Sequence, residues 1–366
     1  MKITCRKSDL LVGINIAMRA VPTKTTLPIL ESFLILADEK IRIITNDKDM
    51  GIETEIKGEV IDPGKIAIDA RIFGEIVRKL PDSEVRIETG VNNRVKVNSE
   101  ETEFILNGRD PNEFPMLPVT ENEKRISMSQ LTLKDLIRQT IFSISMSDTN
   151  SMMRGELFEV IGNLITVISL DSHRISIRKE TLGDYYEPVK VIVPGKTLNE
   201  VSRIIDGEID KTVKIVFDKN FIKFEFDNTV VISRLIEGDF FNVEQMISSD
   251  YETEIQVNKS DFLNCIDRAK TLTLEGEKKP IVLDIQGAEM YLDINTSLGS
   301  MNAHLPINKN GKDFYIGFNP QYFIDPLKVI NDEEISIYFV NANAPCFIRD
   351  EEGTYVYIIL PVNINR

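Results

Sequence analysis

The chain has 366 residues, of which 42% are hydrophobic, so it is long enough for two or three globular domains and too apolar to be disordered. Its 43 basic and 58 acidic residues give a formal net charge of −15, which argues against a protein that simply coats nucleic acid. Three scattered cysteines outside any CxxC pair, together with two histidines, argue against a zinc site.

The N-terminal stretch MKITCRKSDLL carries charges at Arg6, Lys7 and Asp9, where a signal peptide would need its apolar core. Elsewhere no stretch approaches the roughly 18 apolar residues of a membrane span. These features predict a cytoplasmic protein without a membrane association, whose cysteines are reduced.

A short β-like stretch followed by an amphipathic helix occurs three times along the chain. The helices contain SDLL (8–11), KDLI (134–137) and SDFL (260–263), whose aspartates are 126 residues apart both times. Apolar residues recur at helical spacing, as at Leu10 and Ile14 in the first copy. The residues expected at the three N-caps are Ser8, Thr132 and Ser260.

A second helix recurs at an offset of 125 residues, over 69–80, 194–205 and 319–330. In each copy a turn and a strand of alternating polarity follow this helix. Two helices in the same order and at nearly constant spacing indicate an internal repeat. We therefore predict three similar α+β domains, each with two helices packed on antiparallel sheets, over 1–126, 127–251 and 252–366.

The stretch SLDSHRIS (169–176) places Asp171, Ser172 and His173 side by side, the three residue types of a catalytic triad. Adjacent residues on an extended strand point to opposite faces, so Ser172 and His173 cannot aim at one another. The sequence also has no GxSxG elbow and no HExxH motif. His173 is therefore interpreted as a structural residue or as part of a binding surface, and we expect no catalytic residues.

The stretch VKVIVPGKTLNEV (189–201) contains the Gly-Lys-Thr of a P-loop after a predicted strand. A phosphate-binding loop needs a glycine five residues before Gly195, and that position is Lys190. The sequence therefore predicts no nucleotide site, and it indicates no metal or other cofactor.

The six predicted helices are more basic than the rest of the chain. The segments 6–19, 69–79, 132–145, 194–205, 259–270 and 319–330 hold 14 basic and eight acidic residues. Their net charge is +6, and the remaining residues carry −21. One interpretation is that helices simply tolerate lysine and arginine well. The other is a helical surface that contacts a DNA backbone without reading its sequence, and the lack of interleaved aromatics favours duplex over single-stranded DNA.

The repeats and several signature stretches together resemble the bacterial DNA sliding clamps, the β subunits of DNA polymerase III. The stretches are TTLPILESFLI (25–35), GRDPNEFPMLP (108–118), LDSHRIS (170–176), RLIEGDFF (234–241), IGFNPQYFIDPL (316–327) and IILPV (358–362). The resemblance implies a head-to-tail homodimer that closes into a ring of six domains around double-stranded DNA. It also implies that the protein is not an enzyme, that it tethers the replicative polymerase, and that a separate ATP-driven clamp loader opens the ring.

In the family, a cleft between the second domain and the C-terminal tail takes short hydrophobic linear motifs of the polymerase, the loader and repair proteins. The residues that match this cleft are Leu170, His173, Arg174, Ile175, Phe241, Met246, Ile358, Leu360 and Val362. The sequence departs from the family pattern at Asn150, where many clamps carry arginine, and at Phe241, where proline is usual.

The resemblance also assigns the DNA-contacting side and the joints of the ring. The residues expected to contact DNA are Lys7, Arg19, Lys24, Arg71, Arg78, Lys79, Lys134, Arg138, Lys196, Arg203, Arg268 and Lys270. For Lys24, a solvated loop lysine is the alternative interpretation. The residues expected at the dimer interface are Phe104 and Leu106 on one side and Leu272 and Leu274 on the other. A clamp-like paralogue that binds partners or inhibitors without a main replication role is the alternative function, which the sequence does not exclude.

Overall fold

The computed structural model describes residues 1–119, 124–145, 147, 150–243, 246, 250–273, 279–350 and 352–364. Contacts divide the chain into two compact units, one from 1–133 and 196–235 and the other from 134–195 and 236–366. Helices α3 (Gln130–Thr140) and α4 (Gly195–Ile204) each contain a boundary between the units. Within the described part of the chain, no helix combines the length and the hydropathy that a membrane crossing requires.

The first unit contains two antiparallel sheets. The five-stranded sheet has the order β5 (Gly58–Asp62), β1 (Lys2–Arg6), β7 (Glu84–Thr89), β8 (Arg94–Ser99), β9 (Thr102–Asn107). The eight-stranded sheet has the order β10 (Lys124–Ser129), β13 (Thr212–Phe217), β14 (Phe221–Phe226), β15 (Thr229–Arg234), β4 (Met50–Ile56), β3 (Ile41–Asn46), β2 (Ser32–Ala37), β6 (Gly64–Asp69).

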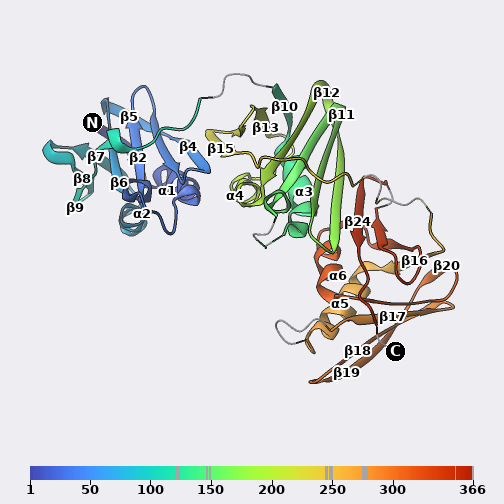
Figure 1. Ribbon diagram of the computed structural model, residues 1–366. Coiled ribbons are helices and arrows are strands. Elements are labelled where there is room, and N and C mark those ends of the chain that lie inside the picture. Colours follow the sequence, from blue (N-terminus) through green and yellow to red (C-terminus); the bar gives the residue numbers. More distant parts are fainter. Residues whose placement is uncertain are drawn as a thin grey trace. The chain divides into compact units, whose positions relative to one another are not determined.

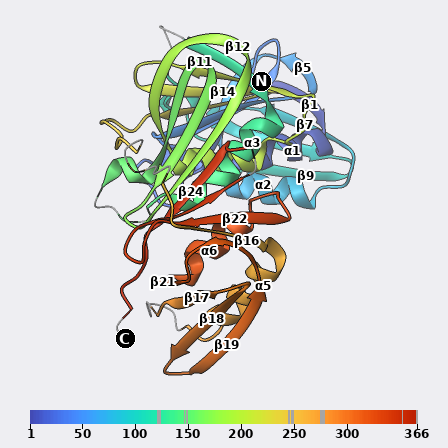
Figure 2. The ribbon, with the colours of Figure 1, turned by 90° about the vertical axis from the view of Figure 1, so that its right-hand side faces the viewer.

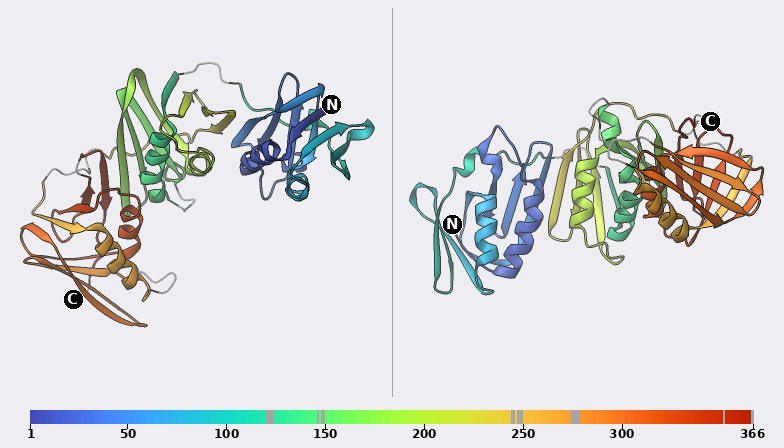
Figure 3. Two further views of the ribbon diagram at one scale, coloured as in Figure 1. Left: turned by 180° about the vertical axis from the view of Figure 1, so that it is seen from behind. Right: turned by 90° about the horizontal axis from the view of Figure 1, so that it is seen from below.

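Helices α1 (Lys7–Ala17) and α2 (Ala70–Lys79) of the first unit lie side by side (Figures 1 and 3). Their buried residues recur at helical spacing, as the sequence predicted: Leu10 and Ile14 on α1, Phe73 and Val77 on α2. These side chains join the alternate, inward-facing residues of the strands in one apolar core.

The second unit also contains two antiparallel sheets. The seven-stranded sheet has the order β11 (Gly155–Leu170), β12 (Arg174–Pro194), β24 (Tyr355–Ile359), β23 (Cys346–Arg349), β22 (Glu334–Phe339), β16 (Thr253–Asn258), β20 (Asn308–Gly311). The four-stranded sheet has the order β19 (Gly299–Pro306), β18 (Glu289–Thr296), β17 (Ile281–Gln286), β21 (Phe314–Phe318). Helices α5 (Lys259–Lys270) and α6 (Pro320–Leu327) pack against each other (Figure 2).

The six predicted helices are all present, but the predicted N-caps of the first helix in each repeat are wrong. Helix α1 follows Arg6, which makes no side-chain cap, and α5 is capped by Asn258, whose side chain accepts the N–H of Asp261. At α3 the Ser129 hydroxyl accepts the N–H of Thr132 at 3.0 Å. Each helix therefore starts directly after its strand, so the chain turns at the last strand residue and not two or three residues later.

Two of the sheets each contain strands from two neighbouring repeats of the sequence. Strand β4 pairs with β15 through residues of the first and second predicted domains, and β12 pairs with β24 through residues of the second and third. These pairings make the compact units differ from the three predicted domains, because backbone hydrogen bonds continue from one repeat into the next. The boundaries at 126 and 251 stay a prediction.

Glu156 of β11 is fully buried, and neither of its carboxyl oxygens has a hydrogen-bond partner among the described residues. Burial raises its pKa from 4.5 to about 8. The folded protein therefore holds this proton up to about pH 8, whereas the unfolded chain loses it near pH 4.5. Between these values the unfolded state binds fewer protons, so the free energy of unfolding decreases as pH rises.

We expect the parent protein to lose about 2 kcal/mol more stability than the Glu156→Gln variant between pH 6 and pH 8, since one pKa unit corresponds to about 1.4 kcal/mol. Urea unfolding at both pH values measures this difference. Glu333→Gln, at an exposed position of the same unit, should follow the parent. Equal pH dependence of Glu156→Gln and the parent would show that Glu156 is ionised in the fold.

Candidate functional site

The Asp-Ser-His stretch forms the turn between β11 and β12, and Asp171 holds it. The Oδ1 atom of Asp171 accepts the backbone N–H groups of His173 at 2.7 Å and of Arg174 at 3.1 Å. The backbone carbonyl of His173 in turn accepts the N–H of Leu360 at 2.9 Å. These bonds fix the C-terminal segment directly beside the turn.

A buried apolar cluster lies next to this turn. Strand pairing places Ile175 opposite Ile358, and both belong to one cluster with Leu170. The cluster also contains Phe240 and Val243 from the segment after β15, which the sequence analysis did not identify. The repeat itself pointed to Phe240, because EFP (113–115) and DFF (239–241) are 126 residues apart, which matches Phe240 with Phe114 of the first repeat.

Three of the predicted groove residues are exposed apolar side chains: Phe241 (43%), Met246 (56%) and Leu360 (41%). The N–H of Met246 donates to the carbonyl of Val243 at 2.9 Å, which places Met246 beside the cluster. Exposed apolar residues next to a buried apolar cluster are typical of a surface that takes a peptide.

Val362 lies apart from this cluster. Its N–H donates to the carbonyl of Gly317 at 2.8 Å, and it lines a separate cavity of about 220 Å³ with Tyr315 and Asn343. Of the residues predicted to form the groove, Leu170, Ile175 and Ile358 therefore share one cluster, Leu360 is joined to the turn by a backbone hydrogen bond, and Val362 lies elsewhere.

The Arg174 side chain points to the other side of β12 from Ile175, as strand alternation requires. Its guanidinium pairs with Asp171 at 3.0 Å and with Asp325 of α6 at 2.5 Å. It also donates to the carbonyl of Phe142 at 2.5 Å. These contacts tie α6 to the turn, and the role of Arg174 in lining the cleft stays a prediction.

Tyr322 of α6 is a neighbour of the turn that sequence reasoning missed. Its ring lies 5.8 Å from that of His173 and 4.8 Å from the Arg174 guanidinium. His173 itself is exposed, and its imidazole lies beside this aromatic ring. No spacing in the sequence links residues 149 positions apart, and only folding brings them together.

The residues of the triad-like and P-loop-like motifs are used in contacts within the fold. The Asp171 carboxylate is used by backbone N–H groups and by Arg174. A Cβ at Gly195 would lie 2.4 Å from Ile144 Cδ1 and 3.1 Å from the Arg154 carbonyl, so the backbone at Gly195 is packed closely against these neighbours. Among the described residues, no group of three His, Cys, Asp or Glu side chains is arranged to hold a metal.

The predicted DNA-contacting residues are mostly on the surface. Nine are exposed: Arg19, Lys24, Arg71, Arg78, Lys79, Lys196, Arg203, Arg268 and Lys270. Lys7, Lys134 and Arg138 are half-buried. Several are in ion pairs: Arg19 and Arg203 with Glu200, Arg78 with Glu75, Arg138 with Asp135, and Lys196 with Asp47. The cations of these pairs are themselves largely exposed, and an exposed pair such as Arg78 with Glu75 is weak, so a polyanion can compete for its cation.

Lys7 has a contact within the fold that accounts for it without DNA. Its Nζ atom donates to the carbonyl of Leu80, at the C-terminal end of α2, at 2.5 Å. Lys259 makes the same contact in the third repeat, where Nζ donates to the carbonyl of Ile330 at 2.9 Å. Both lysines stabilise the C-terminus of the neighbouring helix.

The predicted dimer residues lie on an edge strand and at the end of a helix. Strand β9 is the last strand of its sheet, and Phe104 and Leu106 are half-buried against the core while Ile105 is 59% exposed. Leu272, after α5, is half-buried against the core of the second unit. Leu274 lies outside the described residues.

Comparison with known families matches nearly the whole chain. Residues 1–118, 127–242 and 244–363 match, in order, the N-terminal, central and C-terminal domains of the DNA polymerase III beta subunit. The chain is 35% identical over 378 aligned residues to the beta sliding clamp of Bacillus subtilis strain 168, covering 99% of both proteins. It is 32% identical to the beta sliding clamp of Staphylococcus epidermidis RP62A, again covering 99% of both.

Solved structures show the same similarity. A putative DNA polymerase III beta subunit from Eubacterium rectale ATCC 33656, known from a crystal structure, is 51% identical in sequence to the chain. Its TM-score is 0.97, and the alignment covers both chains completely. The DNA polymerase sliding clamp of Bacillus subtilis is 34% identical, with a TM-score of 0.96 and complete coverage of both chains. The fold predicted from the repeat, with helices packed on antiparallel sheets, is confirmed.

Proposed function

Because this chain belongs to the DNA polymerase III beta subunit family, we propose that it is a ring-shaped sliding clamp that encircles duplex DNA. The match to curated beta sliding clamps over 99% of both chains carries this proposal. The protein acts as a processivity factor: it tethers the replicative polymerase and other partners to the template. Full-length similarity favours this function over that of a clamp-like paralogue without a main replication role.

We infer that the ring is a head-to-tail homodimer of chains with three domains each, over 1–126, 127–251 and 252–366. The internal repeat supports this division, and so does the lysine contact that recurs at Lys7 and Lys259. Phe104 and Leu106 of one subunit meet Leu272 and Leu274 of the other, and two identical joints close the ring.

The clamp is not an enzyme and takes no cofactor; the geometry around Asp171 and Gly195 supports this. Its hold on DNA is topological. The exposed cations of the helices contact phosphates without reading bases, which suits a protein that slides. The separate clamp loader supplies the ATP-driven opening, and the site of action is the cytoplasm.

Partners dock through short hydrophobic linear motifs in the groove beside His173. The buried cluster of Leu170, Ile175 and Ile358 supplies its floor, and Leu360, Phe241 and Met246 supply exposed apolar walls. Apolar anchors in such a groove provide most of the binding free energy, while the rim residue His173 contributes less.

We expect loaded protein to stay on closed circular DNA through gel filtration. After the DNA is cut once, the amount of protein that elutes with the DNA should decrease at least tenfold. Cutting leaves every phosphate contact available, so only a topological link responds to it. Direct binding to short duplexes should be weak and should decrease with salt, since each phosphate contact releases counterions.

The matched control is the same circle, cut and religated before the protein is loaded onto it, which should retain the protein like the uncut circle. Equal retention on circular and linear DNA would mean ordinary binding and would contradict the ring. Labelled protein and a single-site restriction enzyme are sufficient for the measurement.

A further inference from the structure

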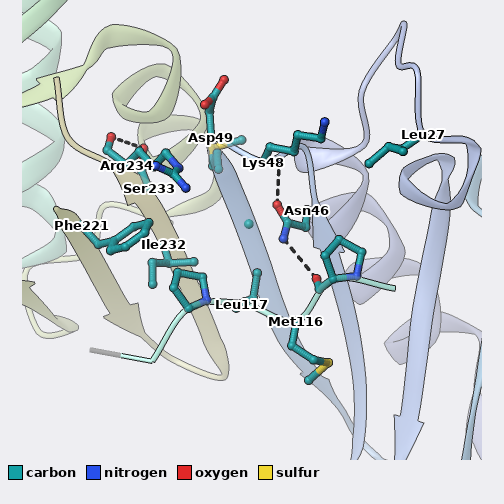
Figure 4. Close-up of a pocket in the computed structure, with 14 residues that line it drawn as sticks. Leu27, Asn46, Lys48, Asp49, Met116, Leu117, Phe221, Ile232, Ser233 and Arg234 are labelled. Atoms are coloured by element: carbon teal, nitrogen blue, oxygen red, sulfur yellow. Dashed lines mark hydrogen bonds between the residues drawn. The ribbon is translucent and has the colours of Figure 1, made fainter. Parts of the chain in front are cut away.

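The first unit contains a pocket of about 340 Å³, lined by apolar and charged side chains, where the segment 115–118 crosses the sheet. Figure 4 shows Phe221 and Ile232 on one side of it and Met116 and Leu117 on another, with Arg234 and Asp49 at one end. Phe221 is half-buried and Met116 is 59% exposed, so the pocket offers an accessible apolar surface.

This pocket is the counterpart, one repeat earlier, of the groove beside His173. The Oδ1 atom of Asp47 accepts the N–H groups of Asp49 at 3.0 Å and of Met50 at 2.7 Å, as Asp171 does in its own turn. The carbonyl of Asp49 accepts the N–H of Arg234 at 2.8 Å, as that of His173 accepts Leu360. The paired strands continue in the same register, with Gly51 opposite Ile232.

The two sites differ in the residues at equivalent positions. Arg234 stands where the groove has Leu360, Lys48 where it has Ser172, and Asp49 where it has His173. Gly51 replaces Ile175, and Leu117 fills the space, since its Cδ2 would lie 2.1 Å from a Cβ at residue 51. The pocket therefore keeps an apolar floor and gains two cations and one carboxylate, at positions where the groove beside His173 has a leucine, a serine and a histidine.

Both cations are available to a ligand. Within the described part of the chain neither the Lys48 ammonium nor the Arg234 guanidinium is in an ion pair, and both residues are exposed. The Arg234 guanidinium lies over the Phe221 ring at 5.4 Å, which holds the charge beside the apolar floor. Lys48 has a φ of 83°, a left-handed conformation that lysine seldom adopts and that is more frequent at functional positions.

We propose that this pocket is a second peptide-binding site, which takes a short acidic segment of a partner protein. One apolar side chain of the segment packs against Phe221, Ile232 and Met116. One neighbouring carboxylate pairs with Arg234 and a second with Lys48, whose ammonium points away from Arg234 in Figure 4, and the Asp49 carboxylate disfavours basic segments. The choice of a peptide as ligand rests on the proposed function of the groove, whereas the position of the site rests on the repeated hydrogen bonds.

The test uses the full-length Leu360→Asp protein, in which the groove beside His173 is blocked. The probe is a fluorescein-labelled peptide of sequence Asp-Ala-Phe-Asp-Glu, followed by fluorescence polarisation. We expect it to bind this protein and to bind at least tenfold more weakly after Arg234→Glu is added. Met116→Asp should weaken it similarly, because a carboxylate then enters the apolar wall. The Lys-Ala-Phe-Lys-Lys peptide should not bind.

Lys65→Glu is the matched control, since it makes the same charge change at an exposed position of the same unit and should leave binding unchanged. Thermal melting of each variant separates loss of binding from loss of folding. No binding to the Leu360→Asp protein would overturn the proposal, as would equal binding after Arg234→Glu. Displacement of the probe by a 12-base-pair DNA duplex would show that Arg234 and Lys48 bind phosphate groups, and it would overturn the assignment of the pocket to a peptide. None of these outcomes affects retention on circular DNA, which tests the clamp function separately.

Discussion

The Leu360→Asp protein is expected to bind a polymerase-derived motif peptide about a hundredfold more weakly than the parent. Leu360 is 41% exposed, and its backbone N–H is fixed to the carbonyl of His173. The substitution therefore places a carboxylate in the apolar wall without moving the backbone. An apolar anchor is worth roughly 1.5–3 kcal/mol, and leaving the new charge desolvated adds to the loss. Fluorescence polarisation with one labelled peptide gives the ratio directly.

Three further measurements make this result specific. Leu298→Asp, at another exposed leucine of the same unit, should bind the peptide like the parent. His173→Ala should have a milder effect, because a rim imidazole supplies at most a hydrogen bond and some stacking. Dimerisation of Leu360→Asp should be unchanged. Parent-like binding by Leu360→Asp, together with complete loss in His173→Ala, would place the binding free energy at the turn and contradict an apolar groove.

Leu272→Glu combined with Leu274→Glu should convert the homodimer to a monomer, with a dimer dissociation constant at least a hundredfold higher. Two-fold symmetry places each substitution at both joints of the ring, so every joint must desolvate new charges. Light scattering across a dilution series measures the change. Leu272 is partly packed on the core of its own unit, so a melting curve must accompany the measurement.

Ile161→Glu is the matched control for this experiment, since Ile161 is a 62% exposed apolar residue of the same unit, on β11. It should leave the dimer intact. An unchanged dimer in the double variant would exclude this interface, although another pair of surfaces could still close a ring. Loss of the dimer should also abolish retention on circular DNA, because an open crescent has no topological hold.

The helices were predictable because their buried faces recur with helical spacing and because the pattern occurs three times. Positions such as Leu10 and Phe73 are decided by local periodicity, which a single sequence displays. The N-caps were not predictable, since Ser8 and Ser260 have the right side chains but the chain turns earlier, after Arg6 and Asn258. The choice depends on where the preceding strand must end.

The candidate groove was predictable only through the family resemblance. Leu170 and Ile175 face each other across the β11–β12 turn, but Ile358 lies more than 180 residues further along the chain, and nothing in the sequence connects it to them until β12 pairs with β24. The same holds for Arg174 of β12, whose partner Asp325 lies on α6, and for the buried carboxyl of Glu156. Long-range pairing decides which face of a strand a residue occupies, and composition carries no record of it.

Strands β4 and β15 are joined by five consecutive residue pairs, from Met50 with Ser233 to Thr54 with Thr229. Strands β12 and β24 are likewise joined by five, from Arg174 to Arg178. Each of these strand pairs resists bending, because a bend would have to break several backbone hydrogen bonds at the same time. A loader that opens the proposed ring therefore meets its lowest resistance where no covalent chain and no intrachain ladder crosses, at the contact between subunits.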